Sequence, residues 1–559
     1  MKEIELNRNF PFYDWVPKPL GILFLMLLFI PIMTVSGVYS ANSSETYGGL
    51  GIMSEHITFV GFATSVGMAA FSPFFYQLVC LRRQKMMLVS GFTFMILLSL
   101  ICARTSDVFI LALCSLVMGF VRQALLMCNL FTLIKYAFGI EATRNLTPGS
   151  EPTTAEGWDK LDQEKTASQP IIYFVFMVLG QLGTWITAWC AYNYEWQHVY
   201  YLMALVMGVA VLVLLVASPY NPYPTKHFPI GWSKFGNVTI FCVMCLSFIY
   251  IMVYGKVLDW YDSTEIRWAT AICVTSIGVF LWLENTRHSP YFLLSVFRIK
   301  SVQGAILLFM GLMILNSSQM FVNIFCSIGM KMENLQVNEL GNWVLAGYFI
   351  GLLVAIVFSR KGWHFKYIFF WGFILLGCYA LFMYFEVQND GLLERMKWPI
   401  IIRGAGMMML YAVTAVYANQ RMPYRYMSTW VCVMLTVRMI VAPGIGAALY
   451  QNVLQERQQH YVTRFAQEYD RTQTTASAQY QQTVRGMQMQ GRSETEAAQM
   501  ASMQLKGKVQ VQATLTAVKE MAGWTCYACI ICAGIVLLVP WTKKKLKQTS
   551  PQTGTPCHG

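Results

Sequence analysis

Long apolar stretches alternate with short polar ones along almost the whole chain. A helix that crosses the hydrocarbon core of a bilayer needs about 20 apolar residues. Fourteen stretches reach that length. We therefore predict an all-α integral membrane protein with 14 transmembrane helices, at residues 19–39, 57–80, 86–103, 107–133, 169–191, 197–217, 236–255, 267–284, 302–327, 340–359, 367–386, 397–419, 427–450 and 522–541.

The basic residues between these stretches predict an orientation. Lys and Arg are concentrated in the short cytoplasmic loops of membrane proteins. With the N-terminus inside, the inside segments hold 24 Lys and Arg residues and the short outside loops hold six. We therefore expect a multi-pass protein of the plasma membrane with both termini in the cytoplasm.

Two segments are too polar to lie in the membrane. Residues 136–168 form an inside loop without clear periodicity. Residues 452–521 lie outside and are rich in Gln, Ala and Met, so we expect two helices there, broken near Gly486–Gly491. Seventy residues are too many for a connector, and the scattered apolar residues need a cover. That cover is either the pairing of the two helices, as a hairpin capping the outer mouth, or a second protein.

The amino-acid composition supports the same class of protein. Apolar residues make up 56% of the chain and charged residues 12%, with a mean hydropathy of +0.46. A soluble domain carries about 25% charge, so soluble, disordered and collagen-like classes are excluded. The net charge of +13 sits at membrane edges, which argues against a nucleic-acid partner. Most of the 15 cysteines lie in apolar runs, and Cys526, Cys529 and Cys532 have no fourth ligand nearby, so we expect no metal and no cofactor.

The crossings fall into two similar sets of six, separated by two. The domains that we expect are a cytoplasmic segment at 1–18, an N-terminal six-helix bundle at 19–217, two linker helices and a cytoplasmic linker at 218–301, a C-terminal six-helix bundle at 302–541 that includes the outside loop 452–521, and a cytoplasmic tail at 542–559. Basic loops, arginines and small residues recur at corresponding places in the two sets, as in Arg122 and Arg403. Such repeats place a transport site at the half–half interface near the middle of the membrane.

On these features the chain resembles the major facilitator superfamily, in its fourteen-crossing EmrB/QacA-type drug-efflux branch, over nearly its whole length. Residues 195–200 resemble that branch's Trp-Arg-Trp-x-Phe segment, and Glu284–Lys300 resembles its linker before the second half. Arg403–Gly406 and Arg438 with Gly444 and Gly446 match its second-half patterns. The loop after the second crossing departs from the family, because Cys80 stands where the family carries an Asp. The first crossing also lacks the family's Asp.

The resemblance implies two six-helix bundles that rock about a central cavity. Three arginines lie inside predicted crossings, where a charge costs roughly 3 kcal/mol or more and therefore needs a reason. They either bind a polar or anionic substrate or tie backbone carbonyls between helices. The residues that we expect at the substrate cavity are Arg122, Gln123, Gln181, Trp185, Asn316, Gln319, Asn323, Arg403, Met407, Tyr411 and Arg438.

Helical spacing supports part of this set. Asn316, Gln319 and Asn323 are three and four residues apart, which puts all three amides on one face of an α-helix. Amides facing lipid are costly, so this face is expected to meet the interior, either at the cavity or as hydrogen bonds between helices.

No acid lies well inside a crossing, and arginine cannot give up its proton at working pH. The expected proton-coupling residues are therefore Glu55 and Asp107, near the outer mouth. The expected gating residues are Arg82, Arg83, Gly180, Gly183, Pro443, Gly444 and Gly446. The glycines are more simply explained by close helix packing.

The leading functional hypothesis is a secondary active transporter that exports drugs or other lipophilic compounds by alternating access, as an antiporter coupled to protons. The alternative is a porter of the same fold for another solute, such as an anionic metabolite, without proton coupling. An enzyme is not expected, because the seven histidines are scattered singly and no paired acids converge. The resemblance further implies a bacterial inner membrane, with a periplasmic adaptor and an outer-membrane channel as partners.

Overall fold

The computed structural model describes residues 11–40, 43–74, 84–138, 155–220, 233–287, 290–361, 363–387, 393–420, 422–468 and 474–539. The secondary structure of these residues is helical, without a strand. Fourteen of the helices are long and apolar enough to cross a membrane, in agreement with the sequence prediction. Arg82 and Arg83 lie outside the described residues.

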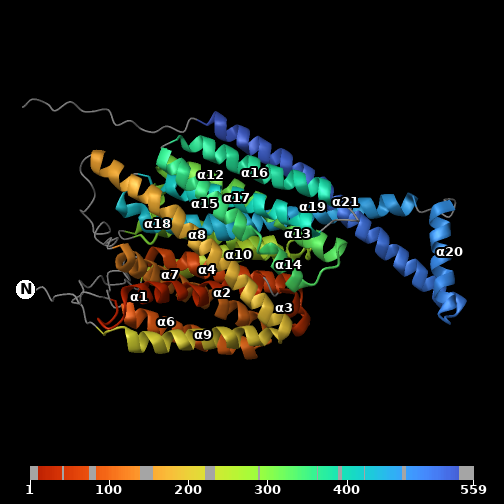
Figure 1. Ribbon diagram of the computed structural model, residues 1–559, viewed down its shortest axis with the longest axis horizontal. Coiled ribbons are helices and arrows are strands. Elements are labelled where there is room, and N and C mark those ends of the chain that lie inside the picture. Colours follow the sequence, from red (N-terminus) through yellow and green to blue (C-terminus); the bar gives the residue numbers. More distant parts are fainter. Residues whose placement is uncertain are drawn as a thin grey trace, which may run out of the picture.

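The first six crossings form one bundle (Figure 1), and the buried residues of one apolar core belong to these crossings and to Phe12 and Val16 just before them. Their helices are α1 (Lys18–Leu27) with α2 (Phe29–Ser40), α4 (Ser54–Phe71) with the 3₁₀ turn η1 (Ser72–Phe74), α6 (Gln84–Arg104), α7 (Val108–Phe138), α8 (Ala155–Asn193) and α9 (Trp196–Ala217). A short helix, α3 (Ser43–Leu50), joins the first two crossings. The polar loop expected at 136–168 is thus partly helical, because α8 starts at Ala155, in a stretch of good helix formers.

Two linker helices, α10 (Ser233–Tyr254) and α11 (Thr264–Thr286), pack against each other, with the turn η3 (Trp260–Asp262) between them. A connector that contains the turn η4 (Leu294–Arg298) leads from α11 into the second bundle. Phe241 of α10 and Phe280 of α11 belong to a second apolar core, which includes residues of α4 and of the C-terminal crossings. Of the linker pair, α10 contacts both bundles through α4 and α19, and α11 packs against α10.

The last six crossings are less regular than the first six. They comprise α12 (Lys300–Asn316), the 3₁₀ turn η5 (Ser317–Gln319), α13 (Met320–Ile324) and the π-helix η6 (Phe325–Gly329) as one crossing; α14 (Asn334–Gly341) with α15 (Val344–Lys361); α16 (Phe365–Glu386); α17 (Leu393–Ala418); α18 (Tyr424–Thr436), the π-helix η7 (Val437–Val441) and α19 (Ala442–Glu468) as one crossing; and α21 (Glu494–Leu538). A mid-helix 3₁₀ turn often marks a hinge, and π-bulges are frequent at functional sites.

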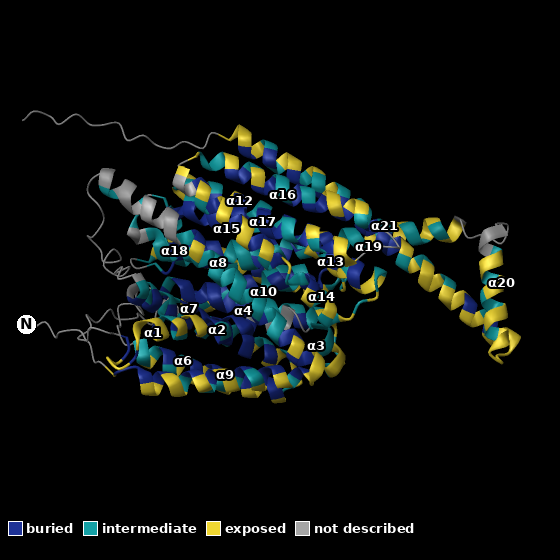
Figure 2. Ribbon diagram, in the orientation of Figure 1, coloured by how far each residue is buried: buried dark blue, intermediate teal, exposed yellow. Residues whose placement is uncertain are grey.

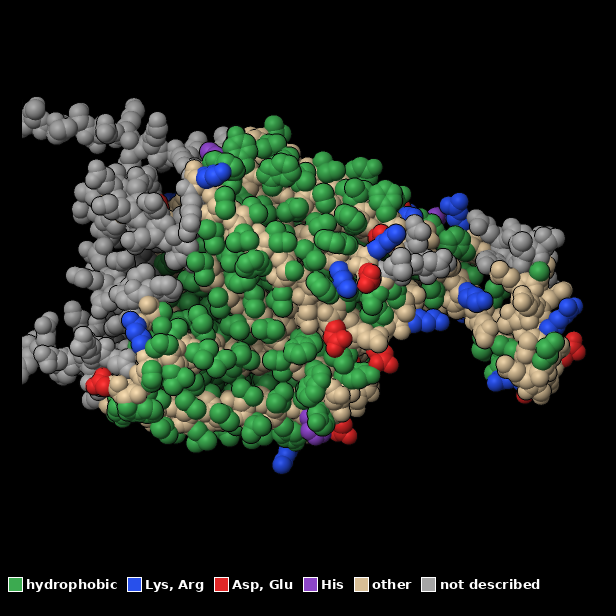
Figure 3. Space-filling model, viewed as in Figure 1, with side chains coloured by type: hydrophobic (Ala, Val, Ile, Leu, Met, Phe, Trp, Pro, Cys, Tyr) green, Lys and Arg blue, Asp and Glu red, His purple; other side chains and the backbone are tan. Residues whose placement is uncertain are grey.

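The surface of the bundles is apolar (Figure 3), with charged side chains gathered at the ends of the crossings and on the segment beyond them. Large apolar side chains are exposed along the outward faces of α6, α9, α11 and α16, while the inward faces are buried (Figure 2). This pattern is that of helices whose outward faces contact lipid.

Reciprocal glycines show that the two bundles repeat one packing arrangement. A Cβ on Gly67 would overlap the carbonyl oxygen of Leu116, and a Cβ on Gly119 would overlap that of Thr64. In the second bundle, Gly347 meets the carbonyl of Ile401, and Gly404 meets that of Val344. In all four helices the glycine follows the contacted carbonyl by three residues, so α4 and α7 correspond in register to α15 and α17.

The crossing helices α19 and α21 extend beyond one end of the bundles (Figure 1), and with α20 (Thr474–Met489) they form what we call the arm, residues 452–468, 474–489 and 494–521. The turn between α20 and α21 lies at Gln490–Arg492, with Gly491 at φ 85°. Gly486 lies inside α20. The sequence predicts two separate helices in this segment. The structure instead has one separate helix, α20, and the continuations of the crossing helices α19 and α21, which no proline interrupts. We call the end of the bundles that carries the arm the arm end.

Candidate functional site

Arg403 of α17 is the centre of a polar group inside the second bundle. Its side chain is only 6% exposed. Its Nη1 donates hydrogen bonds to Asn316 Oδ1 (3.1 Å) and Gln319 Oε1 (3.0 Å), and its guanidinium lies 5.9 Å from the ring centre of Tyr379. Its Nε has no hydrogen-bond partner among the described residues. The positive charge is therefore held by neutral groups, with bonding capacity left over.

The 3₁₀ turn η5 explains why two amides converge on Arg403. Side chains three residues apart eclipse in a 3₁₀-helix, so Asn316 and Gln319 point the same way across Ser317–Gln319. Gln319 is exposed although it bonds to the buried Arg403, so the group is reachable from the protein surface. Asn323, expected on the same face, is exposed and makes no side-chain hydrogen bond to the described residues. The α-helical spacing used in that prediction does not hold through the turn.

A second group joins the two bundles. The Arg438 guanidinium, in the π-helix η7, lies over the ring of Tyr411 at 4.6 Å from its centre. The Tyr411 ring makes edge contacts with Tyr173 of α8 at 5.4 Å and with Phe309 of α12 at 6.0 Å. Arg438 makes no hydrogen bond to the part of the chain that the structure describes. A stacked guanidinium keeps its N–H edge free for a carboxylate or a phosphate.

The two groups lie on one helix. Arg403 and Tyr411 are eight residues apart on α17, which is about 12 Å along the helix axis. Met407 lies midway and is half-buried. Sequence reasoning placed these three residues on one face and missed Tyr173 and Tyr379. The signal for Tyr173 was its spacing of eight residues from Gln181, which puts both on one face of α8.

The expected residues of the first bundle are placed differently. Arg122 is buried on α7, where its Nη2 contacts Met33 Sδ of α2 at 3.3 Å. Gln123 is 1% exposed, and neither of its side-chain polar atoms has a hydrogen-bond partner among the described residues. Trp185 is half-buried on α8. These contacts place Arg122 against the first crossing, within its own bundle.

Hydrogen bonds cross between the bundles at the arm end, and each of them ends on α14 or a residue flanking it. Gln181 Nε2 donates to Asn342 Oδ1 (3.1 Å), Tyr192 Oη donates to Glu333, and Asn334 Nδ2 donates to both carboxylate oxygens of Glu45 (2.9 and 3.0 Å). The amide of Gln181 is thus engaged in an inter-bundle contact. This end of the interface is held closed by polar bonds.

The two acids expected to couple protons lie at the starts of helices. Asp107 is exposed, and its carboxylate accepts a hydrogen bond from the backbone N–H of Phe109 (2.9 Å), as a helix N-cap does. Glu55 accepts a hydrogen bond from Ser54 Oγ in the first turn of α4 (3.1 Å). The next residue, His56, contacts Tyr254 Oη of α10 through Nδ1 at 2.6 Å, a pair that sequence reasoning did not find.

Two of the expected gating glycines lie where helices approach each other closely. A Cβ on Gly183 would come within 3.2 Å of Thr34 Cα, and one on Gly446 would overlap Ser317 Oγ. The first joins the fifth crossing to the first, and the second joins the thirteenth to the ninth, which are corresponding pairs. Gly444, which follows Pro443 in α19, faces Ile249 of the linker, and Gly180 faces open space.

Comparisons with known proteins agree with this architecture. No protein-family model and no curated protein sequence matches the chain. A mutant of the nucleoside transporter NupG is similar in structure, with 11% identity, coverage of 92% of this chain and 99% of that chain, and a TM-score of 0.52. A POT family transporter in complex with thioalcohol conjugated peptide has 12% identity, coverage of 94% and 96%, and a TM-score of 0.52. Another, in complex with 5-aminolevulinic acid, has 11% identity, the same coverage, and a TM-score of 0.51.

At these identities the likeness shows the fold alone. The chain has the major facilitator fold that the sequence predicts, with two six-helix bundles and two extra helices. The EmrB/QacA-type drug-efflux branch stays a prediction.

Proposed function

We propose that the protein is a secondary active transporter that moves a small organic solute by alternating access. Two pseudo-repeated bundles with a polar group near the middle of the membrane are the arrangement on which such carriers are built. The reciprocal glycines of α4 with α7 and of α15 with α17 support the repeat. The bonds at the arm end are of the kind that rocking of the bundles would break and reform.

The observation that carries the proposal is the uncompensated charge of Arg403. A guanidinium inside a crossing is costly, and here two neutral amides satisfy only part of it. An acidic group on the solute would supply the missing negative charge through a charge-assisted hydrogen bond. Arg438, stacked on Tyr411, offers a second such group about two helical turns away. We therefore favour a solute with an acidic group and a planar apolar part.

Export of drugs or other lipophilic compounds is the second candidate. The rings of Tyr411, Tyr173 and Phe309 and the thioether of Met407 favour it, because aromatic and Met surfaces adapt to varied apolar ligands. The outward direction of transport rests on the sequence resemblance.

Substitution of Arg403 tests the proposal in purified protein reconstituted into liposomes. Arg403→Gln removes the charge and should lower uptake of organic anions about 10- to 100-fold, the effect of one or two lost charge-assisted hydrogen bonds. Uptake by the Arg403→Lys protein should lie between that of the wild type and that of Arg403→Gln, because lysine keeps the positive charge but cannot donate two parallel hydrogen bonds. Arg395→Gln is the control, since Arg395 lies on the same helix but is exposed and pairs with Glu386. Unchanged anion uptake in Arg403→Gln, or uptake confined to neutral and cationic lipophilic compounds, would contradict an acidic solute.

Proton coupling forms a separate part of the proposal. We propose that any dependence of transport on a pH gradient runs through Glu55 or Asp107, although the helix-capping bond of Asp107 already occupies one of its oxygens. Wild-type protein and the double variant Glu55→Gln, Asp107→Asn are compared in liposomes with an imposed pH gradient. Wild-type transport that ignores the gradient would favour the uncoupled porter. Gradient-driven transport that survives both substitutions would show that other groups carry the proton.

We also propose that the arm docks a second protein outside the membrane, of the adaptor kind that the sequence resemblance implies for a bacterial inner membrane. The arm projects beyond the bundles and exposes Met489 and Met503. The self-packed hairpin is the competing explanation, and Tyr480 Oη bonds to the carbonyl of Ala498 across α20 and α21 (3.4 Å).

A further inference from the structure

Three consecutive residues of the connector between α11 and α12 bond to three different parts of the protein. Tyr291 Oη donates to the carbonyl of Ala70 at the end of α4 (2.7 Å). The N–H of Phe292 donates to Glu284 Oε2 of α11 (3.0 Å), and the N–H of Leu293 donates to Thr429 Oγ1 of α18 (3.3 Å). The first bundle, the linker pair and the second bundle therefore meet at one short segment.

The end of α4 is built to accept such bonds. Pro73 has no N–H, so the carbonyl of Ala69, four residues earlier, loses its usual helical partner and accepts from the backbone N–H of Ser72 instead. Cys432 Sγ of α18 contacts that carbonyl at 3.3 Å, one residue before the carbonyl used by Tyr291. The helix then tightens into the 3₁₀ turn η1. Two adjacent carbonyls of the first bundle are thus held from outside it.

The junction is buried, so these bonds are shielded from water. Tyr291 is 5% exposed and Thr429 is 2% exposed. The Tyr291 ring packs against Phe74 of η1 and Phe241 of α10, at centroid distances of 5.8 and 6.3 Å. A buried polar group that loses its hydrogen-bond partner destabilises the structure more than an exposed one does. Each of these buried bonds therefore contributes to holding the junction together.

A buried carboxylate anchors the connector to the linker pair. Glu284 is 5% exposed and accepts from Asn237 Nδ2 (2.7 Å), and Arg287 Nη1 donates to Asn237 Oδ1 (2.6 Å). Because Glu284 also holds the N–H of Phe292, the position of the connector is fixed by both linker helices. The linker helices therefore have a mechanical link to the place where the bundles meet.

We propose that Tyr291–Leu293 is a latch that holds the two bundles together at the end opposite the arm. The helix α4 starts beside α3 at the arm end and finishes at Phe71, next to Ala70, so the latch lies at the other end of the interface from Glu45 and Asn334. Opening this end requires the bond from Tyr291 to Ala70 or the bond from Leu293 to Thr429 to break, because the connector cannot stay with both bundles once they separate. The linker pair sets how easily that happens.

Cys432 is a natural reporter of the latch. Its side chain is fully buried against Ala69, so opening of this end exposes its thiol. Full-length protein in detergent is treated with a hydrophilic maleimide, and labelling of each cysteine is followed by peptide mass spectrometry. Tyr291→Phe removes one hydroxyl and keeps the ring, and should raise the labelling rate of Cys432 about fivefold, the factor for one hydrogen bond of about 1 kcal/mol. Thr429→Val should act in the same direction.

Tyr450→Phe is the matched control. Its hydroxyl is also buried and bonds to Thr525, but both residues belong to the second bundle. Cys529, buried away from the junction, is the internal reference for general loosening. Labelling at Cys432 that rises in both latch variants, with Cys529 and the Tyr450→Phe protein unchanged, supports the latch. An unchanged Cys432 rate in latch variants with wild-type thermal stability would overturn it, as would an equal rise at Cys529. No solute is needed, so the result is independent of the substrate proposed above.

Discussion

At the scale of single residues, glycine decides how closely the crossing helices approach. The reciprocal pairs Gly67 with Gly119 and Gly347 with Gly404 each sit on a backbone carbonyl of the neighbouring helix. Small residues at such positions let helices in a membrane pack through direct backbone contact. A side chain there displaces a rigid backbone rather than a flexible side chain.

Substitution of these glycines tests the point. Gly119→Ala adds a Cβ that overlaps the carbonyl of Thr64, and should destabilise the protein by about 1–3 kcal/mol through overpacking. Gly208→Ala is the control, because nothing lies within 4 Å of its added Cβ and alanine favours a helix by about 1 kcal/mol. Thermal unfolding in detergent should show a lower midpoint for the first variant and an equal or higher one for the second. Equal midpoints would mean that the two helices can separate at no cost.

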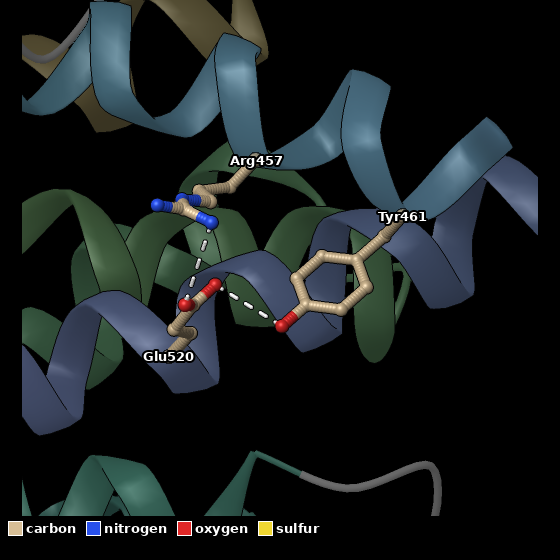
Figure 4. A network of polar contacts seen from close by, with 3 residues as sticks. All are labelled: Arg457, Tyr461 and Glu520. Atoms are coloured by element: carbon tan, nitrogen blue, oxygen red, sulfur yellow. Dashed lines mark hydrogen bonds and ion pairs between the residues drawn. The ribbon is translucent and has the colours of Figure 1, made fainter. Parts of the chain in front are cut away.

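At the scale of elements, a polar group joins α19 and α21 to each other at the base of the arm. Glu520 of α21 accepts a hydrogen bond from Tyr461 Oη of α19 (3.1 Å) and lies 3.8 Å from Arg457 Nη1 (Figure 4). The Arg457 guanidinium also lies over the ring of Trp524 at 4.8 Å. Arg457, Tyr461 and Glu520 lie beyond the apolar part of the crossings, so polar contacts rather than apolar packing hold α19 against α21 here.

Removal of Glu520 should loosen the arm and leave the bundles intact. Half-exposed ion pairs contribute at most about 1 kcal/mol, so Glu520→Ala should change the unfolding midpoint little. Hydrogen exchange of residues 452–468 should rise severalfold, because two of the contacts to α21 are lost. Lys506→Ala, which removes an exposed charge from the same helix, should leave that exchange unchanged. Equal exchange in all three proteins would show that the network does not hold α19.

At the scale of the whole molecule, the arm projects beyond the bundles, and its two edges are close together at the base. Gln458 Nε2 donates to Thr514 Oγ1 (2.9 Å), so the two edges of the arm lie side by side where it leaves the bundle. A short Gly-Ser bridge can therefore replace residues 458–515, and it leaves Arg457, Glu520 and Trp524 in place. It removes one buried core residue, Leu515.

This deletion tests the docking proposal. The shortened protein should insert normally and retain transport in liposomes. Co-purification of an adaptor from the native cells and export from those cells should be lost. An adaptor that still co-purifies in full would remove the arm as its docking site. Loss of transport in liposomes would instead favour the hairpin that caps the outer mouth.

The sequence by itself determined the number of crossings and the repeat, because the apolar length of a span is a local property set by bilayer thickness. It also placed Arg403, Met407 and Tyr411 on one face of α17, where α-helical spacing holds. The tertiary structure alone decided that Asn323 leaves the Arg403 group, because the 3₁₀ turn η5 changes the period just before it.

Contacts between distant segments were equally beyond the sequence. Tyr173 meets Tyr411 and Tyr291 meets Ala70 only because the bundles pack together. Hydropathy tells which residues lie in the membrane, since that depends on side-chain chemistry. It does not tell which helix buries them, since that depends on how all the helices fit together at once.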